Sequence, residues 1–281
     1  MRFTKMQGCG NDYVYVDCFR ERVEDPSRTA RMVSDRHFGI GSDGLILIGP
    51  SKRADFAMTM YNADGSEGAM CGNGIRCLAK YVYDHGLTDR TRIRVETKSG
   101  IKNLLMRVKD HQVYEVQADM GHPELAADKI PVLADAEQAV DVPAFIRGRE
   151  YRYTAVSMGN PHAVVFAEGV DGLDLEKLGP EFEHYRDFPD RVNAEFVEVT
   201  GADRFRMRVW ERGSGETMAC GTGACAAAVA AVLSGRIAAG PGEARLKGGS
   251  LKIFWDQKEK RFFMTGPAVT VFEGEIDLPR K

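Results

Sequence analysis

A repeat is the feature that most limits how this chain can fold. The segment Cys71-Gly72-Asn73-Gly74 returns in related form as Cys220-Gly221-Thr222-Gly223, an offset of 149 residues (220 minus 71). The same offset pairs Gly10-Asn11 with Gly159-Asn160, Phe56 with Phe205, Met58 with Met207, Glu67 with Glu216, Ala79 with Ala228, Gly86 with Gly235 and Lys98 with Lys247. One ungapped offset that links this many identical residues indicates an internal duplication. The chain is therefore expected to form two similar halves.

Each copy of the repeat predicts the same order of elements. Alternating apolar residues predict a strand with one buried face in each copy, at Phe56, Met58 and Met60 and at Phe205, Met207 and Val209. A glycine-rich turn follows, and then a helix is expected over roughly 73–84 and 222–233, ending near a glycine. Both helices are apolar around most of their circumference, which predicts that other elements enclose them.

Two further helices and a connecting segment complete the expected scaffold. Asp25 before Pro26 predicts a helix to about His37, with the aspartate as N-cap and the proline in the first turn. A shorter helix is expected from Asp174 to about Glu183. The segment 119–149 has no clear counterpart at its end and is expected to connect the halves.

Composition favours a soluble enzyme acting on small molecules. Hydrophobic residues make up 43% and charged residues 28%, which is close to the average for globular proteins. The net charge is only −3 and the basic residues are scattered, so a nucleic-acid-binding surface is not expected. The N-terminus lacks a signal-peptide pattern, and the apolar stretch at 224–233 is shorter than the roughly 18 residues of a membrane span. We therefore expect a cytoplasmic protein whose six cysteines are reduced.

Cysteines at the starts of both predicted helices point to acid-base chemistry. Unpaired N–H groups and the positive end of the helix dipole stabilise a thiolate at such a position, which can bring its pKa from about 8.5 toward neutrality. The amides of Gly72-Asn73 and Gly221-Thr222 could bind a carboxylate by the same physics. Inverting a carbon centre requires one group to remove a proton from one face and another to deliver a proton to the opposite face. Cys71 and Cys220 are the candidates for this pair.

Other readings of the cysteines account for less of the pattern. Cys77 and Cys225 are expected to face other sides of their helices and to pack, while Cys9 and Cys18 have no repeated counterpart. A zinc site formed by Cys71, Cys77, Cys220 and Cys225 would need unusual spacing. A Cys-His hydrolase using His162 would not explain a duplicated cysteine. A protein that binds an anionic metabolite without transforming it stays open as a third alternative.

Six ordered motifs resemble those of the diaminopimelate epimerase family over nearly the whole chain. They are Met6-Gln7-Gly8-Cys9-Gly10-Asn11-Asp12, Asn62-Ala63-Asp64-Gly65-Ser66, Met70-Cys71-Gly72-Asn73-Gly74-Ile75-Arg76-Cys77, Gly159-Asn160-Pro161-His162, Val192-Asn193, and Glu211-Arg212-Gly213 running to Ala219-Cys220-Gly221-Thr222-Gly223. The resemblance implies an α+β fold of two pseudo-symmetric domains, each a curled mixed or antiparallel sheet around a central helix. The first domain would span 1–118 plus 269–281 and carry Cys71, and the second would span 119–268 and carry Cys220.

The activity implied by the resemblance is interconversion of LL- and meso-2,6-diaminopimelate by an isomerase that uses no cofactor or metal, in lysine and peptidoglycan precursor synthesis. A cytoplasmic homodimer that binds this small molecule, and neither nucleic acid nor membrane, is also implied. A racemase for another amino acid on the same scaffold is the close alternative.

The resemblance also assigns residues to the site. Cys71 and Cys220 form the acid-base pair, and His162 and Glu211 modulate proton affinity. The residues assigned to substrate binding are Asn11, Asn62, Gly72, Asn73, Asn160, Asn193, Glu211, Arg212, Gly221 and Thr222. Arg212 also makes independent physical sense, because its planar guanidinium matches a second carboxylate. Two positions depart from the family pattern: Gly44 stands where some members have glutamine, and Tyr13 where many have phenylalanine.

Overall fold

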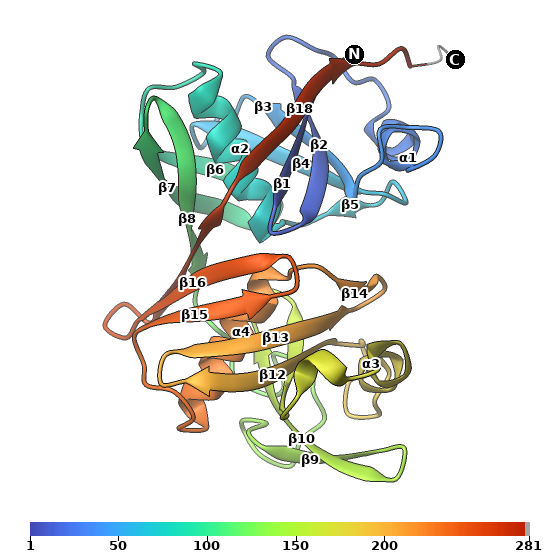
Figure 1. The fold of residues 1–281 in the computed structure, drawn as a ribbon, viewed down its shortest axis with the longest axis vertical. Coiled ribbons are helices and arrows are strands. Elements are labelled where there is room, and N and C mark those ends of the chain that lie inside the picture. The colour runs from blue at the N-terminus through green and yellow to red at the C-terminus, as the bar shows by residue number, and fades with distance from the viewer. Residues whose placement is uncertain (279–281) are drawn as a thin grey trace. The chain divides into compact units, whose positions relative to one another are not determined.

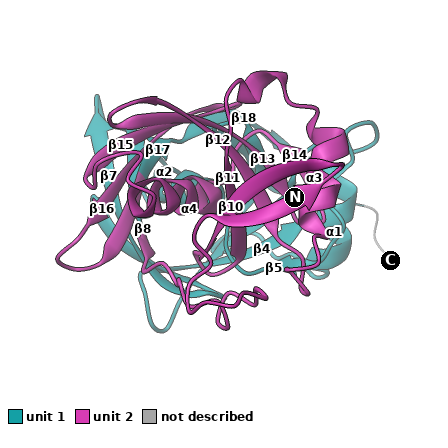
Figure 2. Cartoon of the chain, turned by 90° about the horizontal axis from the view of Figure 1, so that it is seen from below, with its two compact units in different colours: residues 1–119, 265–281 teal, residues 120–264 magenta. Residues whose placement is uncertain are grey.

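The order of helices and strands repeats at the offset found in the sequence. The computed structural model describes residues 1–278, which divide into two compact units, shown in different colours in Figure 2: 1–119 with 265–278, and Met120–Met264. Helices α1 (Pro26–Ser34) and α3 (Leu175–Glu183) begin and end 149 residues apart, and so do α2 (Gly72–Asp84) and α4 (Gly221–Leu233). That the boundaries expected from the sequence separate two independently folding domains stays a prediction.

The remaining elements are strands, together with one short 3₁₀ helix in the second unit (Figure 1). The first unit contains β1 (Arg2–Gly8), β2 (Asn11–Asp17), β3 (Gly44–Gly49), β4 (Phe56–Asn62), β5 (Glu67–Gly68), β6 (Arg92–Thr97), β7 (Gly100–Lys109) and β18 (Val269–Glu275). The second contains β9 (Val142–Ile146), β10 (Arg149–Ser157), β11 (Pro161–Phe166), η1 (Val170–Gly172), β12 (Asn193–Gly201), β13 (Arg204–Glu211), β14 (Gly215–Thr217), β15 (Pro241–Leu246) and β16 (Gly249–Asp256). Strands β8 (Gln112–Gly121) and β17 (Arg261–Pro267) run from one unit into the other.

Strand pairing is the same in both units. In the first, β18, β1 and β2 are antiparallel, β2 and β3 parallel, β3 and β4 antiparallel, β4 and β6 parallel, and β6 and β7 antiparallel. In the second, β9, β10 and β11 are antiparallel, β11 and β12 parallel, β12 and β13 antiparallel, β13 and β15 parallel, and β15 and β16 antiparallel. These mixed sheets with few helices confirm the α+β class.

Each sheet curls around one helix. In the first unit α2 contacts β18, β1 and β2 near one end of the strand order and β7 at the other end, which is possible only if the sheet bends round it. In the second unit α4 contacts β10, β11 and β12 and also β15 and β16. Alanine is the commonest residue of α4, and all residues from Ala224 through Ala231 are buried. Alanine suits this position because it favours the helix and lets strands approach closely.

The outer helices begin where the sequence predicted, but one ends early. The side chains of Asp25 and Asp174 accept from the backbone N–H groups of Arg28 and Lys177 as N-caps. Helix α1 ends at Ser34 instead of near His37, because Asp35 leaves the helical conformation. The Asp35 carboxylate then accepts the N–H groups of His37 and Phe38, both at 2.8 Å, and so stabilises a turn. None of the helices within residues 1–278 is long and apolar enough to cross a membrane.

Candidate active site

Cys71 occupies the N-cap of α2. Its backbone is extended, with φ −126° and ψ 120°, and its Sγ accepts the N–H of Gly74 at 3.3 Å. The thiol also donates to Oδ1 of Asn11 at 3.1 Å, and Nδ2 of Asn73 lies 3.5 Å from the same oxygen. The first unit therefore brings Cys71, Asn11 and Asn73 together at one helix start.

A buried arginine holds this helix start in place. Arg76 is fully buried, and its guanidinium donates to the carbonyl of Gly72 at 3.0 Å, to Oδ1 of Asn73 at 2.9 Å and to the carbonyl of Pro267 at 3.3 Å. A charge in this environment is tolerated only when its donors are satisfied. Arg76 belongs to the motif that begins at Met70, and the motif alone does not predict its role; the available signal is a charged residue in a helix expected to be enclosed.

The side chain of Asn11 is held by a neighbouring carboxylate. Asp43 Oδ2 accepts Nδ2 of Asn11 at 2.7 Å and the backbone N–H of Asp12 at 3.0 Å. Burial raises the pKa of Asp43, and the neighbouring charge of Asp12 raises it further. Burial also acts on Asp12, but the ion pairs with Lys5 at 2.5 Å and Arg36 at 3.3 Å outweigh it and lower the pKa of Asp12.

The glycine at residue 44 leaves space for the buried side chain of Tyr13. Tyr13 is buried, and burial together with the charge of Cys71 raises the pKa of its phenol well above the usual range. A Cβ atom on Gly44 would lie 2.9 Å from Cε1 of Tyr13 and would overlap the carbonyl oxygen of Tyr61. The absence of a side chain at residue 44 therefore leaves room for the tyrosine ring.

Cys220 occupies the N-cap of α4 in the same way. Its backbone has φ −116° and ψ 112°, and its Sγ accepts the N–H of Gly223 at 3.4 Å. Thr222 Oγ1 lies 3.4 Å from the sulfur. Cys220 is 6% exposed, so the residue is nearly removed from solvent.

The electrostatics at Cys220 differ from what the helix start alone predicts. Burial raises the pKa of the Cys220 thiol well above its usual range, and the charges of Glu211 and Glu195 raise it further. The contacts with Thr222 and Gly223 act in the opposite direction but are weaker. The expected shift toward neutrality is therefore wrong for Cys220, because desolvation and two carboxylates outweigh the helix dipole.

His162 is buried between two acceptors. Its Nδ1 lies 2.7 Å from Oε1 of Glu195, and its Nε2 lies 3.1 Å from Oδ1 of Asn160. Both His162 and Glu195 are 0% exposed. Glu195 was missed by sequence reasoning, although the repeat contains a signal for it: at the offset of 149 residues it stands opposite the apolar Ile46.

The residues assigned to the distal end of a substrate also gather in the second unit. Asn193 Oδ1 accepts the backbone N–H of Arg212 at 2.8 Å, and its Nδ2 donates to the carbonyl of Pro161 at 3.1 Å. The guanidinium of Arg212 donates to the carbonyl of Asp190 at 2.9 Å. Glu211 accepts from Oγ1 of Thr217 at 2.5 Å.

Asn62, in the first unit, has a local partner instead. It lies at the end of β4, and its Nδ2 donates to Oγ of Ser66 at 3.0 Å. The side chain of Asn62 is therefore bound to the turn that follows its strand, while Cys71 and Asn11 are in contact with each other.

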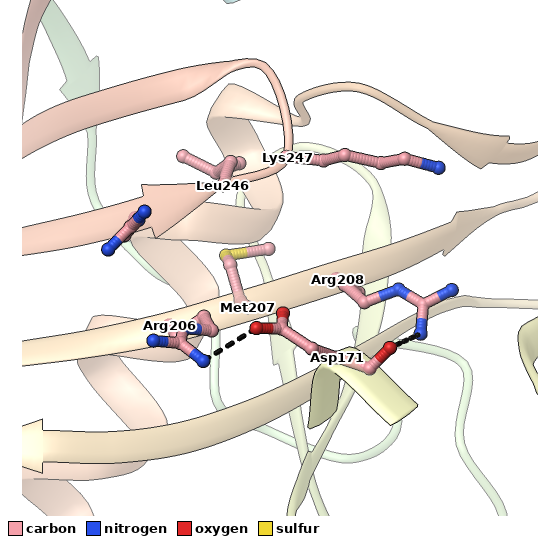
Figure 3. Close-up of a pocket in the computed structure, with 7 residues that line it drawn as sticks. Asp171, Arg206, Met207, Arg208, Leu246 and Lys247 are labelled. Carbon is pink, nitrogen blue, oxygen red and sulfur yellow. Dashed lines mark hydrogen bonds and ion pairs between the residues drawn. The ribbon is translucent and has the colours of Figure 1, made fainter. Parts of the chain in front are cut away.

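A pocket elsewhere on the second unit lacks the groups for this chemistry. It has a volume of about 360 Å³ and is lined by Asp171, Arg206, Met207, Arg208, Arg245, Leu246 and Lys247. Figure 3 shows Arg206 bonded to Asp171, at 2.6 Å, and Arg208 donating to the Asp171 carbonyl, at 3.2 Å. No cysteine, histidine or assigned site residue lines it.

The other cysteines lie away from the helix starts or inside the core. Cys77 and Cys225 are fully buried, and burial raises the pKa of Cys77 to about 11. Within residues 1–278, no group of three or more histidine, cysteine, aspartate or glutamate side chains is arranged to hold a metal ion.

Solved structures with this fold include epimerases. One is a hydroxyproline epimerase from Agrobacterium vitis with bound trans-4-hydroxy-L-proline, with a TM-score of 0.72 and 16% identity, covering 98% of this chain and 90% of that one. A phenazine biosynthesis protein of the PhzF family from Bacillus anthracis also has a TM-score of 0.72 and 16% identity, covering 99% of both chains. At these identities the likeness shows the fold, a duplicated α+β architecture.

Sequence relatives define the family. The chain is 57% identical over 278 residues to a diaminopimelate epimerase of Acetivibrio thermocellus, covering 99% of each. It is 55% identical over 285 residues to one of Agathobacter rectalis, covering 99% of this chain and 100% of that relative. The diaminopimelate epimerase family matches residues 3–126 and 154–271. The chain belongs to this family of isomerases, which confirms the resemblance seen in its motifs.

Proposed function

We propose that this protein interconverts LL-2,6-diaminopimelate and meso-2,6-diaminopimelate without a cofactor, using Cys71 and Cys220 as a two-base pair. The observation that carries the proposal is the repeated N-cap cysteine, one at the start of each enclosed helix. Membership of the family and the identity of 50% or more to several named epimerases support the substrate.

Each thiol serves one face of the α-carbon. In one direction the thiolate of Cys71 removes the α-proton and becomes a thiol, while the thiol of Cys220 delivers its proton to the opposite face and becomes a thiolate. The reverse reaction exchanges the two roles, so no net proton is gained or lost. The raised pKa of Cys220 favours its thiol form, which suits it to deliver the proton in the first direction.

The helix starts supply groups that stabilise the reacting end of the substrate. First-turn N–H groups of a helix have no intrahelical partner and attract anions. We assign the α-carboxylate to the backbone at Gly72-Asn73 and Gly221-Thr222 and to the side chain of Asn11. These donors would stabilise the enolate-like charge that forms when the proton leaves.

We assign binding of the distal amino-acid group of the substrate to residues of the second unit and to Asn62. Arg212 would bind the distal carboxylate through its guanidinium, Glu211 would face an ammonium, and Asn62, Asn160 and Asn193 would complete the hydrogen bonds. His162 would influence proton affinity at the reacting thiols. This division makes diaminopimelate, with two amino-acid ends, a better fit than a monocarboxylic amino acid.

Deuterium exchange tests the function directly. Purified protein in D₂O should incorporate deuterium at the α-carbon of diaminopimelate, observed by NMR or mass spectrometry, and should convert the LL isomer to the meso isomer. Exchange and inversion of another amino acid in a substrate panel, with none of diaminopimelate, would favour a racemase of different specificity. Binding without exchange of any member would favour an anionic-metabolite binding protein.

We further propose a cytoplasmic homodimer that acts in lysine and peptidoglycan precursor synthesis and binds neither nucleic acid nor membrane. Three side chains of β18, Val269, Val271 and Phe272, are 41–54% exposed and offer an apolar surface for a second copy. Light scattering of the wild type and of Val271→Asp would test this: the wild type should have twice the chain mass and the variant the mass of one chain.

A further inference from the structure

Glu195 and His162 form an ion-pair-like contact that is entirely removed from solvent. They lie on the neighbouring parallel strands β12 and β11, and Nδ1 of the histidine is 2.7 Å from Oε1 of the glutamate. Oε2 of Glu195 is buried without a hydrogen-bond partner in the described part of the chain. Removing such groups from water is costly, so a fold does not gain stability simply by containing them.

The first half of the molecule shows that the fold does not require these side chains. At the offset of 149 residues, His162 corresponds to Tyr13 and Glu195 to Ile46. The positions match in space as well. A Cβ on Gly223 would lie 2.6 Å from Oε1 of Glu195, and a Cβ on Gly74 would lie 2.6 Å from Cδ1 of Ile46. Each residue thus packs beneath the first turn of the central helix, and an apolar one suffices in the first half.

The carboxylate is placed to set the orientation of the imidazole. With Nδ1 directed at Glu195, Nε2 faces Oδ1 of Asn160 at 3.1 Å. A carboxylate that binds one nitrogen of a histidine sets the direction in which the second nitrogen points. Among residues 1–278, Oε2 has no hydrogen-bond partner, so the contact of His162 with Oε1 is the one side-chain hydrogen bond that this carboxylate receives.

The same carboxylate lies close enough to act electrostatically on Cys220. The N–H of Gly223, which packs on Glu195, is the one that binds Sγ of Cys220 at 3.4 Å. Burial is the main cause of the raised pKa of the Cys220 thiol, and the charges of Glu211 and Glu195 raise it further. Burial also raises the pKa of Glu195, while the contact with His162 lowers it. His162 therefore favours the charged form of one of the two carboxylates beside this cysteine, against the effect of burial.

We propose that Glu195 is a positioning residue, whose buried carboxylate holds Nδ1–H of His162 so that Nε2 faces Asn160, and that the two side chains act as one unit beside Cys220. The inference rests on the function proposed above. It assigns the glutamate no contact with substrate.

Glu195→Gln tests this unit without changing side-chain volume. We expect kcat for diaminopimelate to fall at least tenfold with KM within threefold of the wild type, and the pH profile of kcat to shift, because Gln cannot hold Nδ1–H as a charged acceptor. Glu198→Gln, on the same strand with a buried and unpaired carboxylate oxygen, is the matched control and should retain wild-type kinetics. Unchanged kcat and pH profile in Glu195→Gln would overturn the proposal.

Nitrogen NMR gives a readout that does not depend on activity. In protein labelled at histidine nitrogens, with His162 assigned by its loss in His162→Gln, the Nδ1 signal should be that of a protonated nitrogen. It should move in Glu195→Gln and stay in Glu198→Gln. If the wild type failed to epimerise diaminopimelate, the proposed function would fail while this spectrum still tested whether Glu195 holds the ring. Identical His162 signals in Glu195→Gln and the wild type would refute the pairing.

A transplant from the first half separates function from stability. The double variant His162→Tyr/Glu195→Ile places the pair found at Tyr13 and Ile46 in the second half. It should melt no lower than the single variant His162→Tyr, which leaves the carboxylate without its donor, yet lose at least 100-fold in kcat. Wild-type turnover in the double variant would show that the pair is dispensable for the reaction.

Discussion

Cys71 and Cys220 begin helices of equal length with nearly the same backbone angles, and each accepts an N–H bond from a glycine three residues later, at 3.3 and 3.4 Å. Their surroundings differ in charge. Cys71 lies against the amide of Asn11 in a helix whose first turns contain the buried Arg76, whereas carboxylates act on Cys220.

Corresponding positions show where the halves diverged. At the offset of 149 residues the first half has Asn62, Ala63 and Arg76 where the second has Glu211, Arg212 and Cys225. The duplication thus kept the backbone that presents a thiol at a helix start, while the neighbouring side chains changed. Two equivalent thiols would titrate together, and a difference in surroundings allows one to hold a proton while the other accepts one.

Removal of either thiol should have the largest effect on activity. Cys71→Ala and Cys220→Ala should each lower the turnover of diaminopimelate at least about 1,000-fold, or about 4 kcal/mol of transition-state stabilisation, because each leaves one face without an acid or base. Circular dichroism should show both variants folded. Near-wild-type turnover in either variant would rule out the two-thiol mechanism.

The buried cysteines provide the control for that experiment. Cys77→Ser and Cys225→Ser place a hydroxyl in a fully buried site, so they should lower stability by about 1–3 kcal/mol while leaving turnover within a few-fold. Equal loss of activity in all four variants would favour the zinc alternative, which metal analysis of the purified protein would check.

Much of this arrangement was predictable because it repeats. The offset of the cysteine motifs placed both central helices within one residue of their observed starts, and the N-cap role of Cys71 and Cys220 followed from glycines that allow the first turn. The end of α1 was not predictable from apolar periodicity, since Asp35 ends the helix through side-chain bonds to the following turn.

Buried charges were the part of the site that pattern analysis missed. Glu195 stands between apolar residues in its strand, and an alternating pattern gives no reason to place a glutamate inside. Arg76 is similarly a charged residue within a helix that is mostly buried. Such residues are satisfied by partners distant in sequence, as with Arg76 and Pro267, so only the folded structure shows which acceptors they bind.

Arg76→Met tests what makes the first helix start different. The methionine fills similar space but leaves the carbonyls of Gly72 and Pro267 and the amide of Asn73 without their donor. We expect the free energy of unfolding to fall by about 3 kcal/mol, measured by urea denaturation. Arg92→Met, at an exposed position in β6, should change it by less than about 0.5 kcal/mol. A loss no larger than that control would contradict the anchoring role of Arg76.

A substitution of Arg212 tests how the distal end of the substrate is bound. The corresponding residue of the first half is an alanine. Arg212→Lys keeps the charge but loses the planar fork, so kcat/KM for diaminopimelate should fall roughly 30-fold, about 2 kcal/mol. Arg186→Lys, whose side chain is 82% exposed, should have no effect. Lysine lacks the distal carboxylate and should be a substrate poorer by orders of magnitude. Equal turnover of lysine and diaminopimelate would contradict the role given to Arg212.

The smallest effect is expected from making the surroundings of Cys220 resemble those of Cys71. Glu211→Gln removes a negative charge while keeping a side-chain oxygen for Thr217. Since Glu211 is the charge that most raises the pKa of Cys220, the variant should lower that pKa and form the thiolate at lower pH. Alkylation of Cys220 by iodoacetamide, followed by peptide mass spectrometry across pH, should accelerate at a lower pH than in the wild type. Glu198→Gln should not shift the profile.

The stability of the variant should change with pH in a direction set by the same charge. The folded-state pKa of Cys220 lies above its unfolded value of about 8.5, so its contribution is fully present below that pH and is lost as pH rises through the folded pKa. Glu211→Gln brings the two pKa values closer and should reduce the loss of unfolding free energy on the alkaline side. Below pH 8, Cys220 should cause no difference between the unfolding free energies of the wild type and Glu211→Gln. Parallel stability curves above pH 9, with unchanged alkylation, would mean that burial alone keeps Cys220 protonated and that the carboxylates do not distinguish the two helix starts.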